Sequence, residues 1–441
     1  MGVHPSTDGV EDRRSVGATG GAGVPLRRRH FLTATGAGAA LGLAGCLGGD
    51  DDDVVTLGAP YILSGFAAMY GEEAEYGVEL AVDQINEEGG IDGQELEVIL
   101  RDTEADPDTG IRQARSLVEE DDVDALFGLD SSAVGLAVAP VMEELQVPIV
   151  ITHAATPFIT APAGVHDRAA GNEYVFRISN HLGQNVHGAA VVAGDLDATR
   201  WTNVGPDYAF GHDTWEYFVA YTEGMDLGLE YVEDGVTFPE LASDDYTPHI
   251  ERILSAEPEA VLSSLWGTDL VTFVDQAEDA GFFEEVDHFL ASVGMGTELP
   301  TEELALPEGQ WASSRYWPFA PDSPENQEFR ETYWDEYERL PTYNAEGAYR
   351  ALWLYKDVIE EAGTTETDAL LETLHGYEHT GPVGEYTISE ETGQAILPSI
   401  WGVTEYSDEW GTHVLEPVHR VDAPPDELES LLDHTDLPAG V

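Results

Sequence analysis

Hydroxyl and carboxylate side chains occur where a short apolar run gives way to an amphipathic stretch. Asp130, Ser131 and Ser132 follow the apolar residues 125–128 and open the stretch 131–145. The first N–H groups of a helix have no partner within it and carry the positive end of its dipole, so they attract anions. We therefore expect Ser131 and Ser132 to bind a carboxylate or amide oxygen of a ligand. The alternative is that Asp130 or Ser131 only caps its own helix.

Motifs for catalysis are lacking in the sequence. It has no Gly-x-Ser-x-Gly elbow, no Walker-type phosphate loop, and no complete Gly-x-Gly-x-x-Gly run after a strand. His375 and His379 have the spacing of metal ligands on a helix, but Gly376 and Gly381 disfavour a helix there, and we interpret both histidines as solvated. We expect no enzymatic activity, no cofactor and no metal.

The single cysteine, Cys46, ends the sequence LAGC at residues 43–46. Upstream lie Arg28, Arg29 and a weakly apolar run of ~15 residues, too short for a membrane span and typical of a twin-arginine (Tat) export signal. LAGC resembles a lipobox, in which the cysteine is acylated and becomes the new N-terminus. The alternative is a signal anchor with an idle cysteine. A lone cysteine excludes a disulfide framework and a cysteine-based zinc site.

The charge balance is strongly acidic. Lys and Arg number 18 against 86 Asp and Glu, a formal charge of −68, and Lys356 is the single lysine. Such a surface repels nucleic acid and anionic membranes. Because the acids are interspersed with 42% hydrophobic residues, we expect a folded protein rather than a disordered acidic tail. We interpret the charge as an adaptation to molar salt, where repulsion is screened over ~3 Å.

Apolar runs and amphipathic stretches alternate from residue 54 onward, which predicts an α/β fold of mostly parallel sheets flanked by helices. Two successive sets of comparable size indicate two lobes. A hairpin-like region is expected around 384–388 and 400–403. Strands are predicted over 54–60, 96–100, 125–128, 148–151, 174–179, 202–204, 260–264 and 288–291, and helices over 73–88, 109–119, 131–145, 184–193, 246–256, 269–280 and 346–362.

Several motifs follow one another in a fixed order. They are Ser64-Gly65, Tyr70-Gly71, and the runs 77–93, 101–107, 244–250 and 344–351. Together they resemble the branched-chain amino acid and amide binding proteins of ABC importers, which have the type I periplasmic-binding fold, in a haloarchaeal-like version. The resemblance covers residues 54 to about 406. It implies two lobes that close on a ligand by hinge bending, with three interlobe crossings near 178–182, 306–310 and 380–384.

The resemblance also implies a domain organisation. We expect a Tat-type lipoprotein signal over 1–45 and an acidic tether over 46–53. The first lobe is expected over 54–178 and the second over 179–308, with returns to the first lobe over 309–380 and to the second over 381–420. An acidic tail is expected over 421–441.

Further binding residues are carried over from the family pattern. The loop after the predicted strand 148–151 offers the carbonyl of Ala154 and the hydroxyl and N–H of Thr156. Aromatic walls are expected from Tyr208 and Trp266 in the second lobe and from Tyr70 at the pocket mouth. The alternatives are a plain turn at Thr156 and packing roles for Trp266 and Tyr70.

One departure from the family pattern bears on the ligand. Amino-acid-binding members carry a carboxylate after the strand equivalent to 288–291, and the run 291–296 has none. Asp269 or Glu298 could substitute, but we interpret both as surface charges. Since a buried ammonium would then lack a charged partner, we favour a small carboxylate, an amide or urea-like solute, or an aromatic acid over leucine, isoleucine or valine.

The expected function is therefore that of an extracellular substrate-binding lipoprotein of an ABC importer. Its expected partners are a small-molecule ligand, an ABC permease and the ATPase of that permease. We expect a monomer that meets the membrane only through its lipid anchor, at the extracellular face, and that binds no nucleic acid. The alternative is a ligand-sensing receptor domain of the same fold that acts on a separate signalling partner; a cell-surface structural protein is a weaker third possibility.

Overall fold

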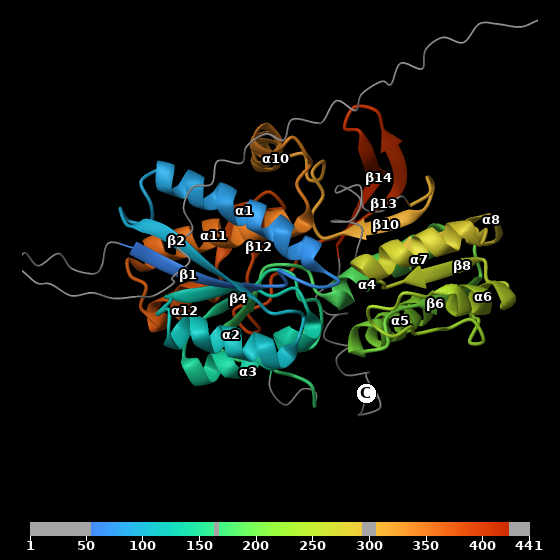
Figure 1. Cartoon of the computed structure of the whole chain (residues 1–441), viewed down its shortest axis with the longest axis horizontal. Coiled ribbons are helices and arrows are strands. Elements are labelled where there is room, and N and C mark those ends of the chain that lie inside the picture. Colours follow the sequence, from blue (N-terminus) through green and yellow to red (C-terminus); the bar gives the residue numbers. More distant parts are fainter. Residues whose placement is uncertain (1–53, 163–166, 293–305, 423–441) are drawn as a thin grey trace, which may run out of the picture. The chain divides into compact units, whose positions relative to one another are not determined.

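The computed structural model describes residues 54–162, 167–292 and 306–422. In these ranges the chain forms a five-stranded sheet, a seven-stranded sheet and a separate two-stranded sheet, with helices packed around the two large sheets (Figure 1). The predicted α/β fold with mostly parallel sheets is thereby confirmed. Cys46, the predicted signal over 1–45 and the tether over 46–53 lie outside the described residues.

The five-stranded sheet is parallel throughout, with the order β2-β1-β3-β4-β5. Every residue of β3 and β4 is buried, as expected for parallel strands that helices cover on both faces. The strands are β1 (Val54–Tyr61), β2 (Glu95–Asp102), β3 (Ala125–Gly128), β4 (Ile149–Ile151) and β5 (Val175–Arg177).

Helices α1 and α11 pack against each other, as do α2 and α3, and Figure 1 shows α1 above and α2 with α3 below this sheet. Helices α1 and α11 cross closely, since a Cβ atom on Gly77 would lie 2.0 Å from the carbonyl oxygen of Ala345. The bounds are α1 (Ala68–Glu87), α2 (Pro107–Glu119), α3 (Ser132–Leu145), the 3-10 helix η1 (Pro157–Ile159), α10 (Pro324–Tyr337), α11 (Tyr343–Ala362) and α12 (Thr367–Leu374).

The seven-stranded sheet has the order β14-β13-β10-β9-β8-β6-β7. Strands β6 to β10 are parallel, while β13 is antiparallel to both β10 and β14. The strands are β6 (Arg200–Val204), β7 (Glu230–Tyr231), β8 (Ala260–Ser263), β9 (His288–Ala291), β10 (Trp311–Ser314), β13 (Ser399–Ser407) and β14 (Thr412–Val421).

Helices α4 and α5 pack against each other beside this sheet, and Figure 1 shows α5 below and α7 above it. A capping box fixes the start of α4: the backbone N–H of His181 donates to the side-chain oxygen of Gln184 at 2.7 Å, and the backbone N–H of Gln184 donates to Nδ1 of His181 at 3.4 Å. The bounds are α4 (Leu182–Asp195), α5 (Ala209–Gly224), α6 (Thr247–Ser255), α7 (Thr268–Asp279) and α8 (Phe282–Glu285).

Most predicted elements are confirmed to within a few residues, and one prediction was wrong. The predicted helix 346–362 is confirmed as α11, which begins at Tyr343 because the Thr342 hydroxyl accepts the N–H of Ala345. Helix α1 begins at Ala68 rather than at 73. The expected hairpin between 384–388 and 400–403 does not form. Instead β11 (Glu378–Gly381) pairs with β12 (Gly384–Thr387), and β13 pairs with β14.

The chain passes between the two large sheets three times. It leaves the five-stranded sheet after β5, returns to elements packed on that sheet after β10, and leaves again between β12 and β13. The sequence placed residues from 309 in the first lobe, whereas β10 lies between β9 and β13 in the seven-stranded sheet. Strand β10 was missed because WASS is too short and polar to show strand periodicity.

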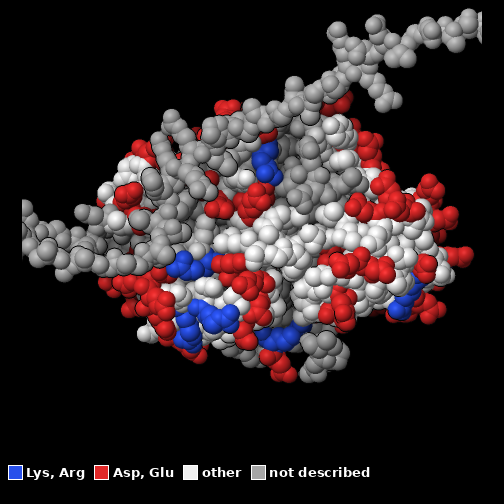
Figure 2. All heavy atoms as spheres, viewed as in Figure 1, with Lys and Arg blue, Asp and Glu red and all other residues white. Residues whose placement is uncertain are grey.

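Acidic side chains are spread over the face shown in Figure 2, with few basic side chains among them. This distribution agrees with the formal charge of −68. In the described ranges, no helix combines the length and apolar character needed to cross a membrane.

Candidate functional site

A small pocket forms where the carboxyl ends of strands from both large sheets meet. Ligands of parallel α/β sheets bind at this edge, because the loops that follow the strands converge there. About 300 Å³ of space not filled by atoms lies in and in front of the pocket, and this figure includes space that is open to solvent. Its lining residues are Tyr70, Asp130, Ser131, Ser132, His153, Ala155, Tyr208, Phe210, Trp266, Arg315 and Tyr343.

Five of the seven residues predicted for ligand binding line this pocket: Tyr70, Ser131, Ser132, Tyr208 and Trp266. The other two, Ala154 and Thr156, lie in the loop after β4 but outside the lining. Both of their carbonyl oxygens accept bonds from Arg177, at 3.1 and 2.6 Å, so the predicted role of the Ala154 carbonyl is not supported. The buried Thr156 hydroxyl has no hydrogen-bond partner, and its contact with a ligand stays a prediction.

The two serines occupy the start of helix α3. Ser131 is the N-cap residue, but its side chain makes no capping bond, and Asp130 bonds elsewhere. The alternative that these side chains only cap the helix is therefore wrong. The Ser132 hydroxyl oxygen accepts the N–H groups of Ala155 and Thr156, at 3.2 and 3.1 Å. These bonds use the lone pairs of its oxygen and leave its proton to donate.

Aromatic rings form one wall of the pocket and connect the two sheets. Tyr70 of α1 stacks on Trp266, which follows β8, with ring centroids 5.5 Å apart. The Tyr70 hydroxyl accepts the N–H of Gly267 at 3.2 Å, and the Trp266 indole N–H donates to the Tyr208 hydroxyl at 3.1 Å. Burial raises the pKa of Tyr208 above its ordinary value. Trp266 and Tyr70 thus pack together and also face the pocket.

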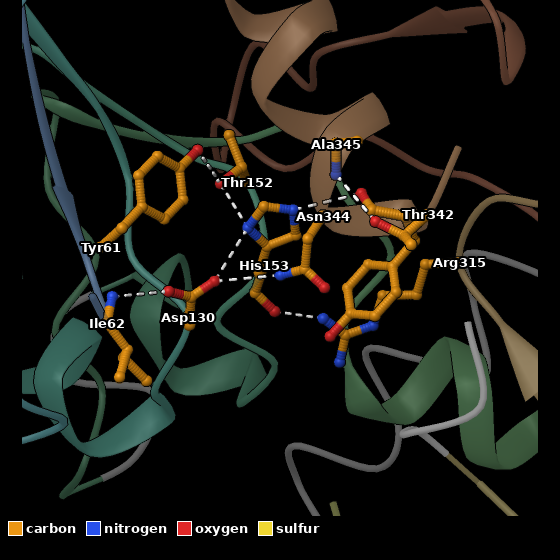
Figure 3. A network of polar contacts seen from close by, with 10 residues as sticks. Tyr61, Ile62, Asp130, Thr152, His153, Arg315, Thr342, Asn344 and Ala345 are labelled. Carbon is orange, nitrogen blue, oxygen red and sulfur yellow. Dashed lines mark hydrogen bonds and ion pairs between the residues drawn. The ribbon is translucent and has the colours of Figure 1, made fainter. Parts of the chain in front are cut away.

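The Asp130 carboxylate is fully engaged by neighbouring segments (Figure 3). One oxygen accepts the N–H of Ile62 at 3.0 Å. The other accepts the side-chain amide of Asn344 at 3.1 Å and lies 3.2 Å from Nδ1 of His153. Because both oxygens are used, Asp130 fixes the positions of β1, the β4 loop and the start of α11.

His153 connects this network to the pocket. Its Nδ1 lies 2.8 Å from the Thr152 hydroxyl, and its Nε2 lies 3.2 Å from the carbonyl oxygen of Tyr343. A carbonyl only accepts, so Nε2 carries a proton. The backbone carbonyl of His153 accepts a bond from Nη1 of Arg315 (Figure 3).

Arg315 is one of the lining residues that the sequence analysis missed, together with His153, Ala155, Phe210 and Tyr343. It directly follows β10 and is only 6% exposed. Its Nη1 is bonded to His153, whereas its Nε has no hydrogen-bond partner. Burial lowers the pKa of the guanidinium below its ordinary value. A signal was present, because an arginine is rare in this sequence and this one follows a buried strand, but the strand itself had been missed.

A second buried arginine, Arg177, ends β5 behind the pocket. It donates four bonds, to Ala154, Thr156, Thr160 and Gln394. Burial and the nearby Arg315 lower its pKa well below the ordinary value. Neither arginine forms an ion pair with a carboxylate within the described ranges. The site therefore carries unpaired positive charge in a protein whose surface is strongly negative.

Comparison with known families agrees with this geometry. The periplasmic binding protein family matches residues 54–405. The chain belongs to this family. Its relatives include the Leu/Ile/Val-binding protein homolog 6 of Brucella suis, 29% identical over 358 residues that cover 77% of this chain and 85% of that protein.

Solved structures of periplasmic binding proteins show the same fold. An ABC transporter substrate-binding protein from Sphaerobacter thermophilus is 27% identical, has a TM-score of 0.71, and matches over 84% of this chain and 98% of its own. A solute-binding protein of an ABC transporter from Rhodopseudomonas palustris HaA2, in complex with p-hydroxybenzoic acid, is 23% identical, with a TM-score of 0.74 over 84% and 98% of the two chains. The chain is a substrate-binding protein of the ABC transporter type, as its sequence predicted.

Two further predictions for this family member were wrong. Asp269 is not a surface charge: it is 2% exposed, and its carboxylate accepts the N–H of Ala242 at 3.0 Å. His379 is not solvated either, since it is buried in β11 with Nδ1 3.2 Å from Asp357. Residues 293–296 and Glu298 lie outside the described residues.

The described residues contain no group of three or more His, Cys, Asp and Glu that could hold a metal ion. The side chains that line the pocket offer hydroxyls, a guanidinium and aromatic rings instead. This set suits the binding of a small organic solute.

Proposed function

We propose that the chain is the extracellular solute-capturing component of an ABC importer and that its two lobes close on a small polar ligand. A permease with its ATPase then receives the ligand from the closed form. The observation that carries the proposal is the pocket, because its lining comes from the carboxyl ends of strands in both sheets. The ligand leaves unchanged, and the protein acts as a monomer.

Contacts that bridge the two sheets support closure by hinge bending. The stack of Tyr70 on Trp266 and the bond from Gly267 to Tyr70 join α1 to the loop after β8. Separation of the lobes would break these contacts and open the pocket to water. Ligand contacts in the closed state then come from Tyr70, Ser131, Ser132, Tyr208 and Trp266.

Candidate ligands are a branched-chain amino acid, an amide or urea-like solute, or a small carboxylate. Two similar proteins support this range: the Brucella relative is named for leucine, isoleucine and valine, and the Rhodopseudomonas palustris protein holds p-hydroxybenzoic acid. The helix start at Ser131 and Ser132 suits the carboxylate or amide oxygen that these solutes share.

Anchoring at the extracellular face of the cell membrane is proposed from the sequence. The twin arginines Arg28 and Arg29 precede the LAGC motif, and acylation of Cys46 would hold the protein through a lipid. The acidic surface is proposed as an adaptation to a salt-rich habitat, where the charges are screened.

Thermal-shift titration of the purified protein in molar KCl tests the binding function. A ligand at about 100 times its dissociation constant should stabilise the fold by about 2.7 kcal/mol and raise the melting temperature. Amino acids, amides, urea and small carboxylates form the panel, and calorimetry measures the affinity of each hit. If no member of the panel raises the melting temperature, the proposal fails.

Transport is tested in cells. Deletion of the gene should abolish uptake of the radiolabelled ligand, and restored expression should return it. NMR of the ligand after incubation with the protein should show it unchanged. Uptake that persists at the original rate in the deletion strain would contradict the importer role.

A further inference from the structure

We infer that Arg315 is the charge partner of a ligand carboxylate and that the ligand is an aromatic monocarboxylate without an amino group. This inference rests on the proposed solute-binding function and narrows its ligand class. Three features of the pocket support it: the incompletely bonded guanidinium of Arg315, the Asp130 carboxylate that already bonds to neighbouring segments, and the aromatic side chains of the lining.

The first feature is the guanidinium of Arg315. It lies in the pocket lining at 6% exposure, with one bond to the His153 carbonyl and no hydrogen-bond partner for Nε. A buried donor without a partner is costly, and a buried charge normally has a counterion. Within the described residues no carboxylate pairs with Arg315, so its free donor suits an anionic group of a ligand. A carboxylate fits because its two oxygens match the fork of an arginine.

The neighbouring serines add hydrogen bonds for the same group. The Ser131 hydroxyl makes no capping bond, and the Ser132 hydroxyl accepts two N–H groups and keeps its proton for donation. Both lie at the N-terminus of the fourteen-residue helix α3, whose dipole favours an anion. The charge of Arg315 and the donors of α3 therefore line one pocket.

The second feature is the missing partner for an ammonium. Among the described lining residues, Asp130 is the one acid; its side chain is only 1% exposed and already bonds to Ile62, Asn344 and His153. An α-amino acid would bring an ammonium into a lining that already contains the cation Arg315. Desolvation without a counterion disfavours that ligand.

The third feature is the shape and polarity of the remaining wall. Five rings line the pocket: those of Tyr70, Tyr208, Phe210, Trp266 and Tyr343. Such a lining suits a ligand that itself contains a ring, because rings pack favourably by offset stacking or edge to face. The Arg315 guanidinium lies 5.7 Å from the Tyr343 ring centroid, so the cation and the aromatic wall adjoin. A benzoate-like acid satisfies both at once.

Calorimetric titration in molar KCl tests the inference with matched probes. The probes are 4-hydroxybenzoate, its neutral isostere 4-hydroxybenzamide, L-leucine and L-phenylalanine. The wild type should bind the acid roughly 10- to 100-fold more tightly than the amide, as expected for a charge-assisted hydrogen bond. L-phenylalanine and L-leucine should bind more weakly than the acid.

Substitutions assign the effect to Arg315. Arg315→Gln should weaken binding of the acid by the same factor and leave binding of the amide unchanged. Arg315→Lys should restore part of the affinity for the acid, since it keeps the charge but not the fork. Arg112→Gln is the matched control, because Arg112 lies exposed on α2, and it should change neither affinity.

The outcomes separate this inference from the proposed function. Equal binding of acid and amide by the wild type, or preferential binding of leucine, overturns the inference and leaves solute capture intact. This comparison needs no variant, so it holds even if Arg315→Gln fails to fold. Absence of binding by the acid together with all other carboxylates, amides and amino acids overturns the proposed function itself.

Discussion

Replacement of Arg177 by methionine should destabilise the protein by about 3 kcal/mol, as the balance of two opposing effects. Methionine fills a similar volume but donates no hydrogen bond. The change removes four hydrogen bonds that a charged donor makes, to Ala154, Thr156, Thr160 and Gln394, although the Gln394 amide oxygen still accepts the Thr160 hydroxyl. A hydrogen bond to a charged group contributes about 1.5–3 kcal/mol. The opposing effect is relief from burying a guanidinium without a carboxylate, which is worth several kcal/mol.

The shift in melting temperature follows from the size of the cooperative unit. With an unfolding entropy of about 2.1 cal/mol/K per residue, a loss of about 3 kcal/mol lowers the melting temperature by about 4 °C if both lobes unfold together and by about 7 °C if one lobe of ~200 residues unfolds alone. Scanning calorimetry in molar KCl measures this shift. It also reports whether the lobes unfold in one transition.

Arg115→Met provides the matched control on the surface. Arg115 forms ion pairs with the exposed Glu119 and Glu144, and exposed pairs contribute little because water and salt screen them. The melting temperature of this variant should therefore change much less than that of Arg177→Met. An Arg177→Met protein as stable as the wild type would refute the reasoning, because it would mean that the four bonds offset no more than the desolvation of the charge.

Three further predictions concern export, salt and pH. Cys46→Ser should release the mature protein into the medium or leave an uncleaved precursor, as cell fractionation will show; wild-type protein of full length in the cytoplasm would contradict the lipobox. The melting temperature should fall between molar and ~0.1 M salt as screening weakens, and an unchanged value would contradict the adaptation to salt. Burial raises the pKa of Glu73 from 4.5 to about 7, against the effect of Arg339. The folded state then binds more protons than the unfolded state, so stability should fall by up to ~3 kcal/mol as pH rises from about 4.5 to 7. Glu73→Gln should flatten this decline in thermal melts, and an equally steep decline in the variant would exclude Glu73 as its source.

The two-lobed fold could be predicted because short, continuous stretches of the sequence indicate its strands and helices. Alternating apolar and amphipathic stretches indicated the parallel strands and their helices, and the resemblance of motifs such as the run 77–93 indicated how they connect. Predicted strands 125–128 and 288–291 coincide with β3 and β9. Strand β10 could not be predicted, because its sequence WASS contains no apolar run. It becomes a strand inside the sheet because β9 and β13 pair with it.

The candidate site was predictable where a residue follows a recognised strand. The two serines were found in this way, because the ends of parallel strands meet at one edge. Tyr208 and Trp266 were carried over from the family resemblance. Arg315 was missed with its strand. The engagement of Asp130 could not be read from the sequence, since Asn344 lies 214 residues away and only the packing of α11 brings it near.

The loop after β4 also has a conformation that the sequence could not predict. The motif indicated that Ala154 presents its carbonyl to a ligand, but the direction of that carbonyl depends on Arg177. Arg177 in turn is positioned by Gln394, which is 217 residues distant. Such orientations depend on contacts that form only after both segments have folded.

The close crossing at Gly77 restricts how this sequence can diverge. One nucleotide change turns a glycine codon into an alanine codon, yet the added methyl carbon would lie 2.0 Å from the Ala345 carbonyl oxygen. Helix α11 would have to shift, and with it Tyr343 and Asn344, which stand at the pocket and at Asp130. Mutations at position 77 are therefore coupled to ligand binding, and substitutions that are tolerated there should occur together with compensating changes at the start of α11.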